Sequence, residues 1–167
     1  MRLKISSATI IVAVFIIAAT TTPTTFADAP GKDACLLLTQ AQVNDALGVS
    51  FGAGTHVTQQ FVKTCTWTPT ASSKDVKAVT LNIQPGDTFE HGKQQLELAN
   101  TAAGGGVKIT SAAGIGDDAY YITTSPTITN LMFKKGTLAF KVSIYGLPSD
   151  KAMAAEKSLA LEVISKL

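Results

Sequence analysis

The side chains best suited to redox, metal or nucleophilic chemistry are two cysteines, Cys35 and Cys65, and two histidines, His56 and His91. In an exported chain, two cysteines most often form a disulfide. Closing a loop of about 30 residues would remove denatured-state entropy worth roughly 3.6 kcal/mol. A redox or metal-binding thiol pair is the alternative, but the spacing is not Cys-x-x-Cys, and two cysteines alone do not make a zinc site. The sequence therefore predicts a structural Cys35–Cys65 disulfide.

The two histidines lack the sequence surroundings of a recognisable site. Asp87 and Glu90 precede His91 and could suggest metal ligands, but acids in the first turn of a helix serve its capping and its dipole. The chain also has no Gly-x-Ser-x-Gly nucleophile elbow. We therefore expect no catalytic residue, no metal site and no cofactor. A secreted hydrolase that uses His56 or His91 is the alternative function.

Two glycine-rich segments could bind a phosphate or an ion. Residues 104–106 follow a predicted helix and lack the Gly-Lys-Ser/Thr ending of a phosphate loop. Residues 114–118 contain two carboxylates but lack the alternating acids and the distant Glu of a calcium loop. A tight turn with solvated acids is the favoured interpretation of the second segment.

Aromatic side chains are the remaining candidates for recognition. Trp67 stands beside a predicted disulfide and is expected in the core. Successive residues of a strand point to opposite faces, so one of Tyr120 and Tyr121 is expected to be exposed. Tyr145 shares the polar face of its predicted strand with a lysine and a serine. The candidate binding surface consists of Tyr120, Tyr121, Lys141, Ser143 and Tyr145.

The N-terminus has the three parts of a secretory signal. Arg2 and Lys4 form a basic region, residues 10–19 are apolar, and Thr25 and Ala27 are small residues that suit signal peptidase. An uncleaved membrane anchor is the alternative, but the apolar run is shorter than the about 20 residues that span a bilayer. We expect cleavage after Ala27 and no stable membrane insertion afterwards.

The predicted division of the chain is a signal peptide at 1–27, a flexible leader at 28–34 and one domain at 35–167, located in the periplasm or outside the cell. Lys32, Asp33 and Ala34 precede Cys35 where a lipid-attachment motif would need Leu and small residues, so lipidation is not expected. A mature chain of about 140 residues can bury one sizeable core.

Removal of the signal makes the mature chain formally neutral. The chain has 14 Lys+Arg and 12 Asp+Glu, and Arg2 and Lys4 leave with the signal, which leaves equal numbers of each sign. No arginine remains in the mature chain. Because nucleic-acid binding needs a basic face, usually with arginine, this composition excludes nucleic acid as an expected partner.

Helical patterns occur at three places. Thr39 and Gln42 have the spacing of a capping box, and Gly48 suits the left-handed end of that short helix. A second helix is predicted at about 88–102, with Asp87 and Glu90 at its start and an apolar stripe formed by Phe89, Leu96, Ala99 and Ala103. A third helix is predicted with Ser149 as its N-cap and a stripe formed by Ala152, Ala155, Leu159, Val163 and Leu167.

Strand patterns fall between these helices. Residues 56–62 are predicted to form a strand that places Phe61 on the same face as Cys65 and Trp67. Clear alternation continues at 79–83 and 119–123 and in a hairpin of 128–133 with 138–145. The resulting fold class is α+β, an antiparallel sheet of about six strands in the order α-βββ-α-βββ-α, with helices packed on it.

Several short motifs occur along the mature chain, namely Cys35-x-Leu-Leu-Thr39, Leu47-Gly48, Cys65-x-Trp67, Gly114-Ile-Gly-Asp-x-Ala-Tyr120 and Phe140-x-Val142. Together they resemble a family of small exported domains of unknown function, many of them actinobacterial lipoproteins. The resemblance covers nearly all of the mature chain, supports the Cys35–Cys65 pairing and is silent on function. The chain departs from the family in lacking the lipid-attachment cysteine, so membrane anchoring is not implied.

These observations together predict an exported, non-enzymatic domain that binds an envelope protein or a small ligand. Export, a disulfide-held scaffold, a neutral charge and the lack of a catalytic motif support this function.

Overall fold

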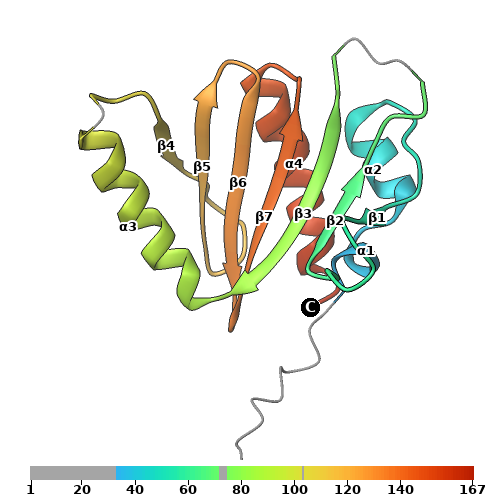
Figure 1. The fold of residues 1–167 in the computed structure, drawn as a ribbon, viewed down its shortest axis with the longest axis horizontal. Coiled ribbons are helices and arrows are strands. Elements are labelled where there is room, and N and C mark those ends of the chain that lie inside the picture. Colours follow the sequence, from blue (N-terminus) through green and yellow to red (C-terminus); the bar gives the residue numbers. More distant parts are fainter. Residues whose placement is uncertain (1–32, 72–74, 103) are drawn as a thin grey trace, which may run out of the picture.

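The chain folds into one seven-stranded antiparallel sheet with helices on both sides (Figure 1). The structure is a computed structural model, and it describes residues 33–71, 75–102 and 104–167. The strand order is β1-β2-β3-β7-β6-β5-β4. The strands are β1 (Thr55–His56), β2 (Thr64–Trp67), β3 (Ala78–Pro85), β4 (Lys108–Ser111), β5 (Asp118–Ser125), β6 (Ile128–Lys135) and β7 (Leu138–Tyr145). The helices are α1 (Ala34–Leu37), α2 (Gln40–Leu47), α3 (Asp87–Ala102) and α4 (Ser149–Ile164). The predicted signal peptide at 1–27 lies outside the described residues.

The centre of the sheet is formed by β3, β7 and β6, whose sequences alternate between apolar and polar residues. β3 pairs with β7 over eight residues, from Ala78 opposite Tyr145 to Pro85 opposite Leu138. On β3, Val79, Leu81 and Ile83 are buried and the residues between them are half-buried. Because alternate side chains of a strand point to opposite faces, this pattern gives the sheet one apolar and one polar face.

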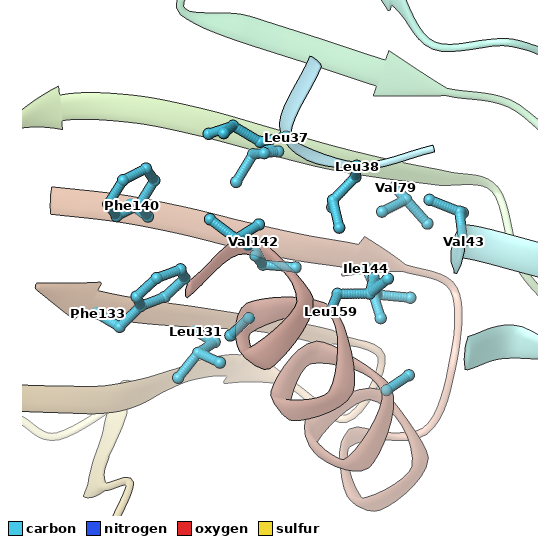
Figure 2. Close-up of a cluster of buried hydrophobic side chains, with 14 of the residues drawn as sticks. Leu37, Leu38, Val43, Val79, Leu131, Phe133, Phe140, Val142, Ile144 and Leu159 are labelled. Atoms are coloured by element: carbon cyan, nitrogen blue, oxygen red, sulfur yellow. The ribbon is translucent and has the colours of Figure 1, made fainter. Parts of the chain in front are cut away.

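The apolar face is covered by α1, α2 and α4. Figure 2 shows Leu159 of α4 among side chains from α1, α2 and the central strands. The predicted stripe of α4 is buried at Ala152, Ala155, Leu159 and Val163, whereas Leu167 is exposed. Ser149 is the first residue of α4 and does not cap it with its side chain, because its hydroxyl instead donates to the Pro126 carbonyl at 3.0 Å. This face forms the main hydrophobic core.

The short helix α2 forms as its sequence predicts. The Thr39 hydroxyl accepts from the Gln42 amide, the Gln42 side chain accepts from the Thr39 amide, and both bonds of the capping box are present. Gly48 ends the helix in the left-handed conformation, with φ of 63°. A helix this short is marginal alone, and burial of Val43 against the core stabilises it.

The predicted α+β class and antiparallel sheet are confirmed, but the number and order of elements are not. The described residues contain seven strands and four helices, so the predicted α-βββ-α-βββ-α order lacks α1 and β4. α1 is a four-residue helix that begins at Ala34 and has Asp33 as its N-cap, and both residues were predicted to lie in the leader. β4 is only four residues long and lies at the edge of the sheet, with a single half-buried residue. Both were missed because short elements have too few residues to show a period.

The strand predicted at 56–62 is wrong. β1 ends at His56, and the chain then turns, with the Phe61 amide donating to the Thr58 carbonyl. Phe61 is 51% exposed and does not share the buried face of Cys65 and Trp67. The alternation is present in the sequence, but beyond His56 the segment pairs with no strand. Its backbone groups bond instead within the turn and, at the Val62 carbonyl, to the Ala34 amide of α1 at 2.9 Å.

α3 lies on the polar side of the sheet, near the β4–β5 end and away from α1 and α2 (Figure 1). Of its predicted stripe, Phe89 is fully buried, Leu96 is half-buried and Ala99 is exposed, while Ala103 lies outside the described residues. The stripe prediction is therefore right only at its first residue. α3 makes most of its contact through its first turns, which leaves Leu98 65% exposed.

The predicted disulfide is present and joins Cys35 of α1 to Cys65 of β2. Cys65 and Trp67 are both buried, and Gly54 lies against them. A Cβ atom at Gly54 would stand 2.6 Å from the Cys65 sulfur and 2.7 Å from the Trp67 ring. The glycine is therefore required by space rather than by backbone conformation.

We predict that Gly54→Ala destabilises the protein by about 1–3 kcal/mol, because an overpacked core must shift a rigid disulfide or an indole ring. Urea denaturation of the oxidised protein measures this change. The matched control is Gly52→Ala, whose Cβ would meet nothing closer than 3.7 Å and which should change the free energy of unfolding by less than about 1 kcal/mol. Equal effects of the two substitutions would contradict the packing argument.

Candidate functional site

A cluster of Asp33, Cys35 and His56 lies at the edge of the sheet where α1 meets β1. Their ligand-capable atoms all lie within 4.8 Å of one another, and among the described residues no other group of three His, Cys, Asp or Glu side chains meets this criterion. The Nε2 atom of His56 is 2.7 Å from Oδ1 of Asp33. His56 is the register partner of Cys65, so β1 places the imidazole beside the disulfide.

Asp33 has two roles in this cluster. It caps α1 by accepting from the Cys35 amide at 2.8 Å, and it pairs with His56. Partial burial is the largest single influence on Asp33 and raises its pKa, but the hydrogen bonds from His56 and from the Cys35 amide together hold that pKa below the ordinary value. Asp33 is therefore an anion that fixes the orientation of the His56 ring, and its side chain remains 27% exposed.

Sequence reasoning named His56 and Cys35 but did not bring them together, and it placed Asp33 in the leader. The signal that could have found the cluster is the Asp-x-Cys spacing, because an Asp two residues before a helical residue suits an N-cap. The meeting with His56 depends on β1 pairing with β2, which no local pattern specifies.

The second candidate is the polar face of the sheet, which we call the open face. We define it by eight polar outward side chains of β2, β3, β6 and β7, namely Thr64, Thr66, Thr80, Asn82, Asn130, Lys141, Ser143 and Tyr145. Hydrogen bonds run between neighbours across it. Asn82 Nδ2 donates to Thr64 Oγ1 at 2.6 Å, and Ser143 Oγ donates to Asn130 Oδ1 at 2.5 Å.

The predicted binding surface is divided by the structure. Lys141, Ser143 and Tyr145 do lie on one face of β7, where Lys141 is opposite Asn82 and Ser143 is opposite Thr80. Lys141 and Tyr145 are half-buried, whereas Ser143 is fully buried between its neighbours. Two of the three residues are thus accessible to a partner.

The expectation that one of Tyr120 and Tyr121 is exposed is wrong, since they are 1% and 9% exposed. They do point to opposite faces, but each face is covered at that position. Tyr120 packs on Phe89 of α3, with ring centroids 5.0 Å apart, and burial raises its pKa to about 12. The Tyr121 hydroxyl donates to the Met153 carbonyl of α4 at 3.1 Å. Both tyrosines anchor helices to the sheet.

His91 and the acidic 114–118 loop, the remaining candidates from the sequence, make local contacts that stabilise the fold. His91 is exposed, and its Nδ1 atom is 3.0 Å from the Asp87 carbonyl within the same helix. In the 114–118 loop, Asp117 accepts from the Gly136 amide at 2.7 Å and pairs with Lys135 at 2.9 Å. The Gly136 and Lys135 hydrogen bonds lower the Asp117 pKa. This carboxylate therefore ties its loop to the β6–β7 turn.

Glu156 is a buried acid of α4 that the sequence did not single out, because it belongs to no motif and lies outside the predicted apolar stripe. Its side chain is fully buried, one oxygen accepts from the Ile144 amide at 3.2 Å, and the other has no hydrogen-bond partner. Burial raises the pKa of Glu156 to about 8 against the single bond from Ile144. The side chain is therefore mainly protonated at neutral pH.

Thr129, the register partner of Ile144, also has a buried hydroxyl without a partner, as does Thr123, which is opposite Thr129. The described core thus contains three buried polar oxygens without a hydrogen-bond partner, on Glu156, Thr129 and Thr123. The arrangement is a cost to folding rather than an open site, because all three polar atoms are inaccessible.

None of the described helices is both long and apolar enough to cross a membrane. The formed disulfide fits an oxidising environment.

No protein-family model, curated protein or solved structure matches the chain. The resemblance to the exported domains of unknown function therefore stays a prediction.

We predict that stability falls as the pH rises from about 4.5 to about 8, because the unfolded Glu156 loses its proton over that range while the folded side chain keeps it. Below that range both states are protonated and the loss is absent. Glu156→Gln should remove this pH dependence. At pH 8 its free energy of unfolding should exceed that of the wild type by about 3–5 kcal/mol. Chemical denaturation across pH measures the difference between the two proteins.

The matched control for this prediction is Glu97→Gln on the exposed part of α3, which should keep the wild-type pH profile. A Glu156→Gln profile parallel to wild type between pH 4.5 and 8 would show that the buried carboxyl does not titrate as described.

Proposed function

We propose that this chain is an exported, non-catalytic domain that binds an envelope protein through its open face. The observation that supports it most strongly is the unequal covering of the sheet. α1, α2 and α4 cover the apolar face, whereas α3 is buried against the other face only through Phe89. Within the part of the chain that the structure describes, the central strands therefore carry no helix over the open face.

The composition of the open face supports a protein partner. Its threonine, serine and asparagine side chains are neutral, with Lys141 as a single cation and Tyr145 as an aromatic beside it. Interfaces of this kind combine polar groups with tyrosine and have few charges. Cavities of about 460, 330 and 280 Å³ are lined by residues outside the open face, whereas a small ligand would favour a concave site.

Export is supported by three features. The sequence has a signal-like N-terminus, the mature chain has the two cysteines paired in a disulfide, and short motifs resemble those of exported domains. An envelope location brings the open face into contact with membrane-associated or secreted proteins, which are the partners we propose.

A double substitution on the open face tests this function. We predict that Lys141→Glu with Tyr145→Ala abolishes capture of the partner from native envelope extracts, with at least a tenfold loss of affinity once that partner is purified. A loss of this size corresponds to about 1.4 kcal/mol, which is typical for truncating an interface anchor. Pull-down followed by calorimetry with the purified partner measures it.

The matched control is Lys151→Glu, which makes the same charge change at an exposed position of α4, on the other side of the sheet. It should bind as wild type does. If Lys151→Glu abolished binding and the open-face variant did not, the interface would lie on the helical side. If the wild-type chain still bound a component of an envelope extract from which proteins had been removed, its partner would be a small ligand instead.

A secreted hydrolase is the second candidate, and the Asp33–His56 pair at 2.7 Å is the observation that favours it. An Asp-oriented imidazole is the general-base part of a triad, although the nearest thiol, Cys35, is bonded to Cys65. Replacing His56 and His91 together with alanine tests this function. An ester or peptide hydrolysis activity that the folded double variant lost would favour the hydrolase over the binding domain.

A further inference from the structure

The Asp33–Cys35–His56 cluster contains all three kinds of side chain that bind zinc, namely a carboxylate, a thiol and an imidazole, and they come from two separate segments. α1 supplies Asp33 and Cys35, and β1 supplies His56. The fourth ligand is present in the bonded partner of Cys35, because Cys65 is opposite His56 in the β1–β2 pairing. Sequence alone offered two cysteines, and the fold adds an imidazole and a carboxylate.

We propose that reduction of the Cys35–Cys65 disulfide converts this cluster into a four-ligand site for Zn²⁺, formed by Asp33, Cys35, His56 and Cys65. The oxidised protein is the resting form, in which both sulfur atoms are occupied by each other. The reduced protein is the metal-binding form. The proposal concerns the sheet edge and is independent of the open face.

The redox step balances with a dithiol as the reductant. A thiolate of the reductant attacks Cys35 Sγ, because Cys35 is half-buried whereas Cys65 is fully buried. The bond between Cys35 and Cys65 breaks, and Cys65 leaves as a thiolate. The second thiol of the reductant then attacks the mixed disulfide, which releases Cys35 and oxidises the reductant to its own disulfide. Two electrons and two protons reach the protein.

Metal binding then releases protons from the ligands. Zn²⁺ binds thiolates, a carboxylate and a neutral imidazole nitrogen. The two thiol protons leave to solvent. The ion takes the place of the proton between His56 Nε2 and Asp33 Oδ1; that proton also leaves to solvent while Nδ1 takes one up, so the imidazole stays neutral. Two thiolates and one carboxylate surround one Zn²⁺, so the site has a net charge of minus one.

The geometry of three of the four ligands is close to what the ion needs. Ligand atoms at about 2.0–2.3 Å from Zn²⁺ lie less than about 4.6 Å from one another, and the ligand atoms of Asp33, Cys35 and His56 already lie within 4.8 Å of one another. Cys65 Sγ is outside this group and is bonded to Cys35 Sγ, so it must move toward the ion after reduction. The side chains of Asp33 and His56 are 27% and 23% exposed, so an ion can reach them from solvent. Their hydrogen bond, together with the capping of α1 by Asp33, positions both ligands before the ion arrives.

Co²⁺ is a suitable spectroscopic probe, because a tetrahedral site with thiolate ligands gives visible absorption and sulfur-to-metal charge transfer. The exported chain is reduced with a water-soluble phosphine, desalted without oxygen and titrated with Co²⁺. We expect one ion per chain in the reduced protein, displacement by Zn²⁺ and no such spectrum in the oxidised protein.

Substitutions of the two ligands that are not cysteines distinguish a built site from two exposed thiols. Asp33→Asn and His56→Gln should each weaken Co²⁺ binding at least about tenfold and change the spectrum. The matched control, His91→Gln, alters the exposed histidine of α3 and should leave both unchanged. Circular dichroism of each reduced protein verifies that it remains folded.

Three results would overturn the proposal. These are a reduced protein that binds no Co²⁺, an oxidised protein that binds it equally well, and an affinity unchanged by Asp33→Asn and His56→Gln. The last result covers a reduced chain that unfolds, because its thiols would then bind the metal without help from Asp33 or His56.

Discussion

The pairing of β3 with β7 is the constraint on which the rest of this structure depends. Among the described strands, it is the one pairing that joins the part of the sheet formed by β1, β2 and β3 to the part formed by β7, β6, β5 and β4. Eight residues of each strand are in register. The pairing places Val79, Leu81 and Ile83 beside the apolar residues of β7, so one continuous surface is available to α4, α1 and α2. A shift of one strand by one residue would move its apolar side chains to the polar face and its polar side chains into the core.

The same register creates the open face. With the apolar side chains on one side, Thr80 and Asn82 must lie on the other, opposite Ser143 and Lys141. These polar groups are therefore assembled from distant parts of the chain by the pairing that forms the core. They satisfy one another along and across the strands, as the hydrogen bond from Asn82 to Thr64 shows. The side chains of the proposed recognition surface are thus positioned by the same strand pairing that forms the core.

Much of the sheet could be predicted from sequence because long strands repeat their alternation. The hairpin of β6 and β7 and the strand around Val79–Ile83 have several successive apolar and polar residues each. α1, β1 and β4 have two to four residues, and no period can be recognised over that length. In the segment after His56, alternation without a pairing partner gave a wrong strand. Local pattern therefore identifies elements that are long, and pairing decides which of the others exist.

The candidate sites were less predictable than the fold because each depends on contacts between distant residues. Lys141, Ser143 and Tyr145 were identified as one face, since two-residue spacing in a strand is a local property. The burial of Tyr120 and Tyr121 was not foreseen, because it requires α3 on one face and α4 on the other. Asp33 meets His56 only because β1 pairs with β2 beside the disulfide.

The open face and the edge cluster meet on β2, where Cys65 lies between Thr64 and Thr66. Cys65 points into the core and the two threonines point outward. Four residues of β2 are held in register by β3, whereas the disulfide fixes only the attachment of α1. Opening the disulfide therefore removes a tie between α1 and β2 without removing the strand pairing that positions the threonines. The two proposed activities rest on different interactions, so the failure of one leaves the other standing.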